Sequence, residues 1–277
     1  MVVQHNLTAA NSNRMLNITT SSQAKSTEKL SSGYKINRAA DDAAGLAISE
    51  KMRKQVRGLT KAVANAQDGI SCVQTAEGAL AEVHDMLQRM NELAMQSANG
   101  TNDADDRSYL NSEVTALKSE INRVANSVTF NNQMLLNGDF AGSKAKVLQV
   151  GFKGTDDQIK ISIDAMDLAG LTLTNLSISD ATDAANAIKD GGSISNAIKT
   201  VSKMRSDLGA IQNRLEHTVN NLNNVVENTQ AAESQIRDTD MATEMVKYSN
   251  NNILAQAGTA MLAQSNQANQ NVLSLLG

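Results

Sequence analysis

The sequence predicts a mainly α-helical fold: an elongated antiparallel helical rod of coiled-coil character, with a small β-hairpin patch and with the N- and C-terminal helices paired. Three observations favour this fold. Apolar residues recur at alternating steps of four and three over long stretches, which keeps one apolar stripe on one helix face. The 277 residues contain no proline, so no residue imposes a helix break. Aromatic residues make up only 2 %, so the core must be built from the aliphatic side chains that pack between helices.

The longest predicted helix runs from about Ala44 to Ala98. At about 1.5 Å per residue it would extend roughly 80 Å, far beyond an ordinary globular helix. Asp41 and Asp42 precede it, where an N-cap and the positive end of the helix dipole favour acids. Its stripe slips in phase near Gly78 and consists of Met52, Val56, Leu59, Val63, Ala66, Ile70 and Val73, then Leu80, Val83, Leu87, Met90 and Ala94.

Two further stripes predict a second and a third long helix, which should bundle with the first. The chain reverses between the first two at "ANGTND", where Gly100 suits a helix end. The second stripe is Leu110, Val114, Leu117, Ile121, Val124 and Val128. The third is Ile194, Ile198, Val201, Met204, Leu208, Ile211, Leu215, Val219, Leu222 and Val226.

Between the second and third stripes the apolar period changes to two, which predicts a β-hairpin near 146–164. In "QIKISID" three isoleucines alternate with Lys160 and Ser162, as in a half-buried strand, and "KVLQVGF" before it is strand-like. Residues 154–157 could close the hairpin. Residues 166–192 are rich in Asp, Ala, Ser and Gly and have weak periodicity, which predicts a short variable surface excursion.

We therefore expect two domains. Residues 1–42 and 236–277 would form a terminal helical unit, and residues 43–235 would form the rod with the hairpin and the excursion. The last charged side chain is Lys247, and the tail from Asn251 to Gly277 has apolar residues at helical spacing with Asn, Gln and Ser between them.

Such a tail is suited to the interior of an assembly. Isolated helices are marginal in water, and amide or hydroxyl groups can hydrogen-bond across a tight helix contact without the desolvation cost of a charge. The apolar residues expected to be buried between subunits are Leu262, Val272, Leu273, Leu275 and Leu276.

Composition and motifs exclude several classes of function. The net charge of −4 gives no basic footprint for nucleic acid, and no stretch of about 20 apolar residues predicts insertion into a membrane. The N-terminus lacks the basic flank and apolar run of a cleavable secretory signal. Cys72 is the single cysteine, without a nearby basic cluster, and this favours a buried inert thiol over a nucleophile.

No enzyme, metal site or cofactor site is visible either. The three histidines, His5, His84 and His217, are scattered without paired-ligand spacing. Glu82 and Asp85 lie beside His84 in sequence, but neighbouring positions on a helix point apart. The glycines near residues 138–154 do not form a phosphate-binding loop and serve turns instead.

Four segments resemble bacterial flagellin, the subunit of the flagellar filament. They are "EKLSSGYKINRAADDAAGLAISEKMR" (28–53), "LQRMNELAMQSANGTN" (87–102), "LGAIQNRLEHTVNNL" (208–222) and the closing "ILAQAGTAMLAQSNQANQNVLSLLG" (253–277). The resemblance covers roughly the first half and the last third of the chain. The chain departs from the family pattern at Cys72, at Ala268 and at its final Gly277.

The resemblance implies a structural protein that assembles head-to-tail into a helical filament for motility, with the terminal unit lining the inner tube. It also implies export through the flagellar secretion apparatus without a cleavable signal peptide, and an extracellular location. The implied partners are other copies of the chain, an export chaperone and a filament cap. The alternative is a monomeric coiled-coil binding module.

The resemblance further implies recognition by the innate immune receptor Toll-like receptor 5. The residues that match the family's receptor patch are Arg89, Leu93 and Glu113, and Gln88 and Gln96 flank them. Arg89 and Leu93 are four residues apart and should share a helix face, and an antiparallel second helix would set Glu113 level with Leu93. We expect Leu93 beside the buried seam and available for contact, either with a neighbouring subunit or with the receptor. The alternative for Arg89 and Glu113 is a solvated ion pair of little consequence.

Overall fold

The computed structural model of the chain describes residues 6–276, without the side chains of residues 155, 269 and 271–276. Contacts divide it into two compact units. The terminal unit contains the described residues up to Val56 and those from Glu227 onward, and the central unit is Arg57–Val226. Both boundaries fall inside helices, whereas the predicted boundaries at residues 42 and 236 lie near helix ends. We predicted a terminal helical unit of residues 1–42 and 236–277 and a rod of residues 43–235, and this division stays a prediction.

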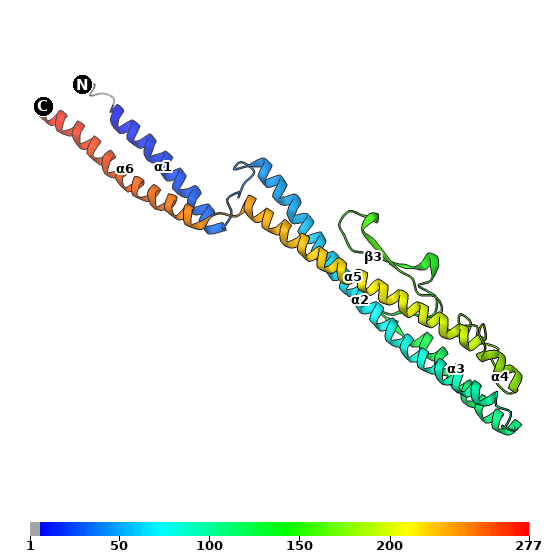
Figure 1. Ribbon diagram of the computed structural model, residues 1–277. Helices are drawn as coiled ribbons and strands as arrows, with labels where there is room; N and C mark the ends of the chain where they lie inside the picture. Colours follow the sequence, from blue (N-terminus) through cyan, green and yellow to red (C-terminus); the bar gives the residue numbers. More distant parts are fainter. Residues whose placement is uncertain (1–5, 277) are drawn as a thin grey trace. The chain divides into compact units, whose positions relative to one another are not determined.

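The predicted mainly α-helical fold with small hairpins is confirmed. The helices are α1 (Leu7–Ser32), α2 (Ala43–Ser97), α3 (Ala104–Ser127), α4 (Ala181–Ile188), α5 (Ser193–Arg237) and α6 (Met241–Leu276) (Figure 1). The three long stripes correspond to α2, α3 and α5, and α2 alone has 55 residues. Asp42 acts near the start of α2 as expected, because its Oδ1 accepts the backbone N–H of Gly45 at 2.9 Å. Helix α4 was not predicted.

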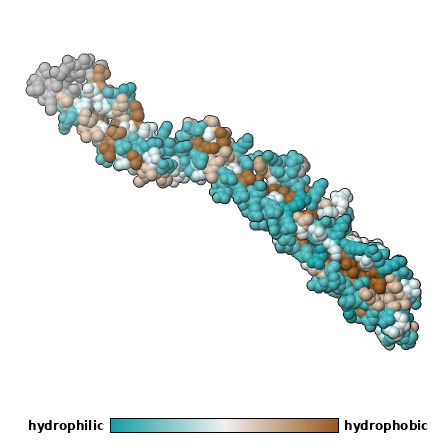
Figure 2. Space-filling view, viewed as in Figure 1, coloured by the Kyte–Doolittle hydropathy of each residue, from teal (hydrophilic) through white to brown (hydrophobic). Residues whose placement is uncertain are grey.

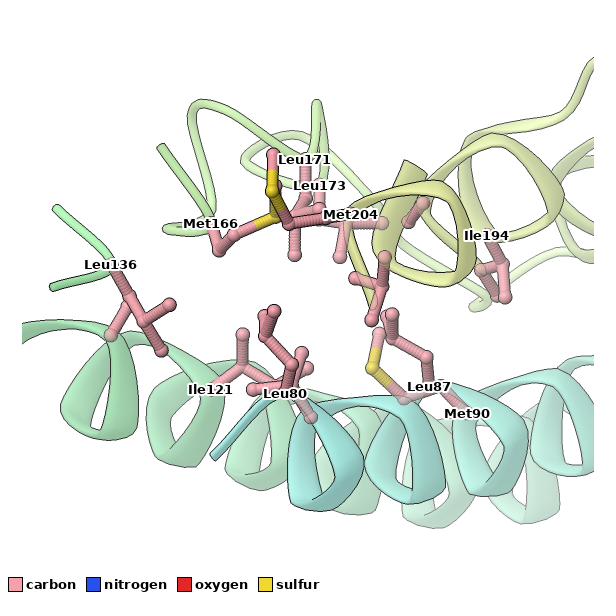
Figure 3. Close-up of a cluster of buried hydrophobic side chains, with 14 of the residues drawn as sticks. Leu80, Leu87, Met90, Ile121, Leu136, Met166, Leu171, Leu173, Ile194 and Met204 are labelled. Carbon is pink, nitrogen blue, oxygen red and sulfur yellow. The ribbon is translucent and has the colours of Figure 1, made fainter. Parts of the chain in front are cut away.

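The core of the central unit is aliphatic and lies between α2, α3 and α5. Leu80, Leu87 and Met90 of α2 are fully buried, together with Ile121 of α3 and Leu208 of α5. In Figure 3 the α2 side chains point toward Met204 of α5 and toward loop residues that pack above them. The apolar stripes predicted from the sequence are thus the helix faces by which α2, α3 and α5 pack against one another.

Two hairpins attach to the helices of the central unit. Strand β1 (Thr129–Phe130) pairs antiparallel with β2 (Gln133–Met134), and β3 (Lys146–Gln149) pairs antiparallel with β4 (Gln158–Ile161). The second hairpin is the predicted one, whereas the first was not predicted. The second hairpin packs on α2 at Gly69, where an added Cβ would lie 2.2 Å from Leu148 Cδ1. The missing side chain of Gly69 therefore makes room for this hairpin.

Residues 166–178 belong to the core rather than to a surface excursion, so that prediction is wrong. Met166, Leu171, Leu173 and Ile178 are buried in the same cluster as the α2 stripe (Figure 3). Lys118 of α3 holds the backbone of the segment by donating from Nζ to the carbonyl oxygens of residues 174 and 176, both at 3.0 Å. Helix α4 follows and buries Ala184 and Ala187.

In the terminal unit α1 and α6 pair along their lengths in antiparallel fashion (Figure 1). Near one end Thr8 Oγ1 lies 2.9 Å from Ser265 Oγ, and toward the other end Ser26 lies against Glu244. Between them Gly258 faces Leu16. The predicted pairing of the terminal helices is confirmed.

The backbone that follows α1 is bonded to the backbone that links α5 to α6. Gly33 ends α1 with a φ of 75°, a conformation that glycine adopts without strain. Its carbonyl oxygen accepts the N–H of Thr239 at 2.9 Å, and the N–H of Lys35 donates to the carbonyl oxygen of Arg237 at 2.6 Å. The segment after α1 and the segment between α5 and α6 are thereby tied at one place.

Candidate functional site

The predicted receptor residues lie on the antiparallel helices α2 and α3. Arg89 Nε donates to Glu113 Oε1 at 2.9 Å, and Arg89 Nη1 donates to Glu92 Oε2 at 3.2 Å. The hydrogen bond to Glu113, followed by that to Glu92, raises the pKa of the Arg89 guanidinium. The Arg89 and Glu113 side chains remain 52 % and 44 % exposed, so they present a charged pair to solvent.

The neighbouring glutamines extend this surface. Gln88 is exposed, and its Nε2 lies 2.9 Å from Nε2 of His84 one turn earlier. Gln96 is exposed two turns further along α2. We call Gln88, Arg89, Gln96 and Glu113 the α2–α3 patch.

Leu93 does not belong to that surface, and the prediction that it stands outside the core is wrong. It is only 1 % exposed and lies in the same cluster as Leu171 and Ile178. Ser97, one turn after Leu93, donates from Oγ to the carbonyl oxygen of Ile178 at 2.6 Å. Two antiparallel helices alone would leave Leu93 open, but residues 166–178 form an additional layer over this face of α2.

The second candidate surface is the outer face of the α1–α6 pair. Large apolar side chains remain exposed on both helices, several by more than half of their area (Figure 2). We call this set the terminal apolar face: Leu7, Met15, Ile18, Met241, Met245, Val246, Ile253, Leu254 and Met261. Single exposed apolar residues are ordinary, but a recurring set on one two-helix unit marks an interaction surface.

The predicted assembly residues lie further along α6. Leu262 is half-buried. Val272, Leu273, Leu275 and Leu276 lie outside the described side chains, so their role stays a prediction.

Two polar features of the terminal unit were not predicted. Ser26 and Glu244 are buried against each other between α1 and α6. Arg237 Nη1 donates to Glu50 Oε1 at 2.8 Å while its guanidinium lies 4.7 Å from the Tyr34 ring centre. Glu244, Tyr248 and Asn251 follow each other at steps of four and three. This spacing is a signal that could have placed Glu244 on the side of α6 that faces α1.

The described residues offer neither a candidate catalytic site nor a candidate metal site. Within residues 6–276 no group of three or more His, Cys, Asp and Glu side chains could hold a metal ion. His217 lines an open groove beside Asp157 of the second hairpin, apart from His84. Cys72 is buried, and desolvation raises the pKa of its thiol, which favours the unreactive protonated form. None of the described helices has both the length and the apolarity that a membrane span requires.

Family models match both ends of the chain. The bacterial flagellin N-terminal helical region matches residues 3–141, and the bacterial flagellin C-terminal helical region matches residues 192–276. The first match includes α1, α2 and α3 with the α2–α3 patch, and the second includes α5 and α6.

Similar proteins match over the full length. A flagellin of Halalkalibacterium halodurans is 52 % identical over 276 residues, and the flagellar filament 33 kDa core protein of Treponema phagedenis is 49 % identical over 285 residues; each match covers all of both chains. The solved structure of a candidate flagellar hook-associated protein from Vibrio parahaemolyticus aligns with a TM-score of 0.59 at 14 % identity. It covers 72 % of this chain and 100 % of that one, and it supports the fold alone.

Proposed function

The chain belongs to the bacterial flagellin family, and from this premise we propose that it polymerises head-to-tail through its terminal helices. Its role is that of a structural subunit of the extracellular flagellar filament, and it is not an enzyme. The filament role replaces the alternative of a monomeric binding module.

The observation that carries the proposal is the terminal apolar face. Ile253 and Leu254 of α6 are 61 % and 56 % exposed, and Ile18 of α1 is 55 % exposed. Two paired helices cannot cover apolar side chains on their outer faces, and neighbouring copies of the chain would cover them in a filament. Burying one such side chain contributes about 1.5–3 kcal/mol, and the set contributes several times that amount. Contacts of the head-to-tail kind that do not close on themselves produce open helical polymers.

The lack of charge in the tail supports the same role. From Asn251 onward the chain contains no Asp, Glu, Lys or Arg, so no ion must be desolvated when neighbouring helices cover it. The amide and hydroxyl groups that occupy the polar positions can be satisfied by partners on those helices.

The test is seeded polymerisation of the purified full chain, with filaments scored by sedimentation and electron microscopy. The variant Ile253→Asp, Leu254→Asp should fail to elongate, because it places two charges on the terminal apolar face. Ala116→Asp is the matched control, since it adds a charge at an exposed position of α3. Deletion of the residues after Tyr248 should also abolish polymerisation. Normal filaments from either the double variant or the truncated chain would overturn the proposal.

We also propose that the monomer is recognised by Toll-like receptor 5 through the α2–α3 patch. The patch is exposed, and its Arg89 guanidinium is oriented by two carboxylates on α2 and α3. An oriented charged pair amid neutral amide groups suits a polar contact with a receptor. Leu93 would act only by supporting the patch from beneath. The family resemblance also favours an export chaperone and a filament cap as partners.

A further inference from the structure

Ser26 and Glu244 are the only buried side chains of α1 and α6 among those that the structure describes. Ser26 is 5 % exposed and Glu244 is 7 % exposed, and Ser26 Oγ donates to Glu244 Oε1 at 2.7 Å. The most enclosed point of this helix pair is therefore a polar contact rather than an apolar one.

The remaining contact stripe specifies the alignment of the two helices weakly. Buried and half-buried positions recur at steps of three and four on both helices, and most carry small or polar side chains. On α1 they include Ala9, Ser12, Leu16, Thr19, Gln23, Ser26 and Leu30, and on α6 they include Glu244, Tyr248, Asn251, Ala255, Gly258, Leu262 and Ser265. Because these positions recur every seven residues, sliding one helix by seven residues again places the contact positions of α1 opposite those of α6. Few large apolar contacts oppose such a shift. At one end of the pair the backbone hydrogen bonds of Gly33 with Thr239 and of Lys35 with Arg237 also oppose it, so along the helices themselves the alignment depends on polar contacts.

We infer that the hydrogen bond between Ser26 and Glu244 fixes the axial register along the α1–α6 pair, beyond what the backbone hydrogen bonds at the Gly33 end provide. A carboxylate taken out of water needs hydrogen-bond partners. Lys247 Nζ lies 3.6 Å from Glu244 Oε2, but it is on the same helix and accompanies Glu244 in every register. Ser26 is on the other helix, and a shift of seven residues moves it by about 10 Å. In the direction that brings Met15 to Ser265, Gly33 takes the place of Ser26 and offers Glu244 no side-chain donor. Fixing register is the best-attested use of a single buried polar group between helices.

The register determines which apolar side chains of the two helices lie side by side on the terminal apolar face. A shift of seven residues would displace Ile18 of α1 by about 10 Å relative to Ile253 of α6. Glu244 and Ser26 are positioning residues in this sense. Their effect on polymerisation depends on the proposed function, whereas the register itself does not.

The test reads the register directly with cysteine pairs in the full chain carrying Cys72→Ala. Because Thr8 Oγ1 and Ser265 Oγ are 2.9 Å apart, the pair Thr8→Cys, Ser265→Cys should close as a disulfide in the observed register. The pair Met15→Cys, Ser265→Cys should close only after a shift of seven residues, since a disulfide spans Cα atoms about 4.4–6.8 Å apart. Both pairs are oxidised in the monomer and again after seeded polymerisation, and the closed fraction is measured by mass spectrometry.

In the parent the Thr8 pair should close in preference to the Met15 pair. Glu244→Leu and Ser26→Ala should each reduce this preference by about tenfold, because the buried polar partner is lost. Glu244→Gln keeps an acceptor for Ser26 and should keep the preference. Asn251→Leu, at a half-buried position of the same stripe, is the matched control and should also keep it.

An unchanged preference in Glu244→Leu, or closure of the Met15 pair in the parent, would overturn the inference. Failure of the parent to polymerise would instead overturn the proposed function, and the register would still be read in the monomer.

Discussion

The guanidinium of Arg237 lies over the ring of Tyr34, 4.7 Å from the ring centre, with only 14 % of the arginine side chain exposed. The same guanidinium donates to Glu50 of α2, and the backbone of Arg237 accepts the N–H of Lys35. Arg237 thereby connects the end of α5 to the segment after α1 and to the start of α2. Both its side chain and its backbone therefore contribute to the junction of the terminal unit.

Arg237→Lys should destabilise this junction although it keeps the charge. Lysine lacks the planar group that stacks on Tyr34 and donates sideways to Glu50. The lost stacking amounts to about 1 kcal/mol. Denaturant unfolding followed by tyrosine fluorescence measures the change. Arg123→Lys is the control, because that arginine is 64 % exposed and pairs within its own helix. Equal effects of the two substitutions would contradict the role of Arg237.

The junction should also weaken in acid. The hydrogen bond from Arg237 lowers the pKa of Glu50 below its ordinary value of 4.5. Because the folded pKa is the lower one, the contribution is fully present above pH 4.5 and is lost as the pH falls through the folded pKa. NMR of labelled Tyr34 should show the ring environment change in that range. In Glu50→Gln the acid-dependent change should shrink, and an unaltered titration would rule out Glu50 as its source.

Leu93→Ala should destabilise the central unit. Its side chain is 1 % exposed, and truncation of a buried leucine costs about 2–5 kcal/mol. Met95→Ala in the same helix is the matched control, since Met95 is 59 % exposed and its loss should change the free energy of unfolding by less than about 0.5 kcal/mol. Thermal unfolding compares the two. A Leu93→Ala chain as stable as Met95→Ala would mean that the layer formed by residues 166–178 does not cover Leu93.

Arg89→Ala should reduce receptor binding by the monomer without unfolding it. The substitution removes the donor that joins Glu113 and Glu92 at the α2–α3 patch, and both carboxylates stay exposed. Binding of the purified monomer to the receptor ectodomain and circular dichroism of the same sample are the two measurements. Arg123→Ala removes an exposed arginine elsewhere on α3 and should leave binding unchanged. Unaltered affinity of a folded Arg89→Ala monomer would refute the proposed site.

Lys118→Met should release the segment that covers α2. Lys118 donates to two carbonyl oxygens of that segment, and desolvation lowers the pKa of its ammonium group. Methionine fills similar space but cannot donate, so hydrogen exchange of residues 171–178 should become faster. Lys61→Met on the exposed face of α2 should leave it unchanged. Equal protection in both variants would show that apolar packing alone holds the segment.

The long helices could be predicted because their stripes carry a strong period, and α2, α3 and α5 lie where Leu80, Val114 and Leu208 indicated. The burial of Leu93 could not be predicted from its helix, because the covering layer comes from a distant segment with weak periodicity. The first hairpin could have been predicted from the pair Asn131 and Asn132. These residues occupy its turn with φ of 49° and 62°, a conformation that asparagine tolerates. The partner of Glu244 is more than two hundred residues away, and local patterns contain no information about it.

Because Cys72 is buried, its thiol can report how often the central unit opens. Its thiol lies in the main core cluster beside Val73, and the chain has no second cysteine to compete for a reagent. A small thiol-reactive probe can modify it only while the central unit is open, so the labelling rate counts opening events without any engineered reporter. Comparing the labelling rate of the free monomer with that of the filament would measure how much polymerisation slows the opening of the central unit.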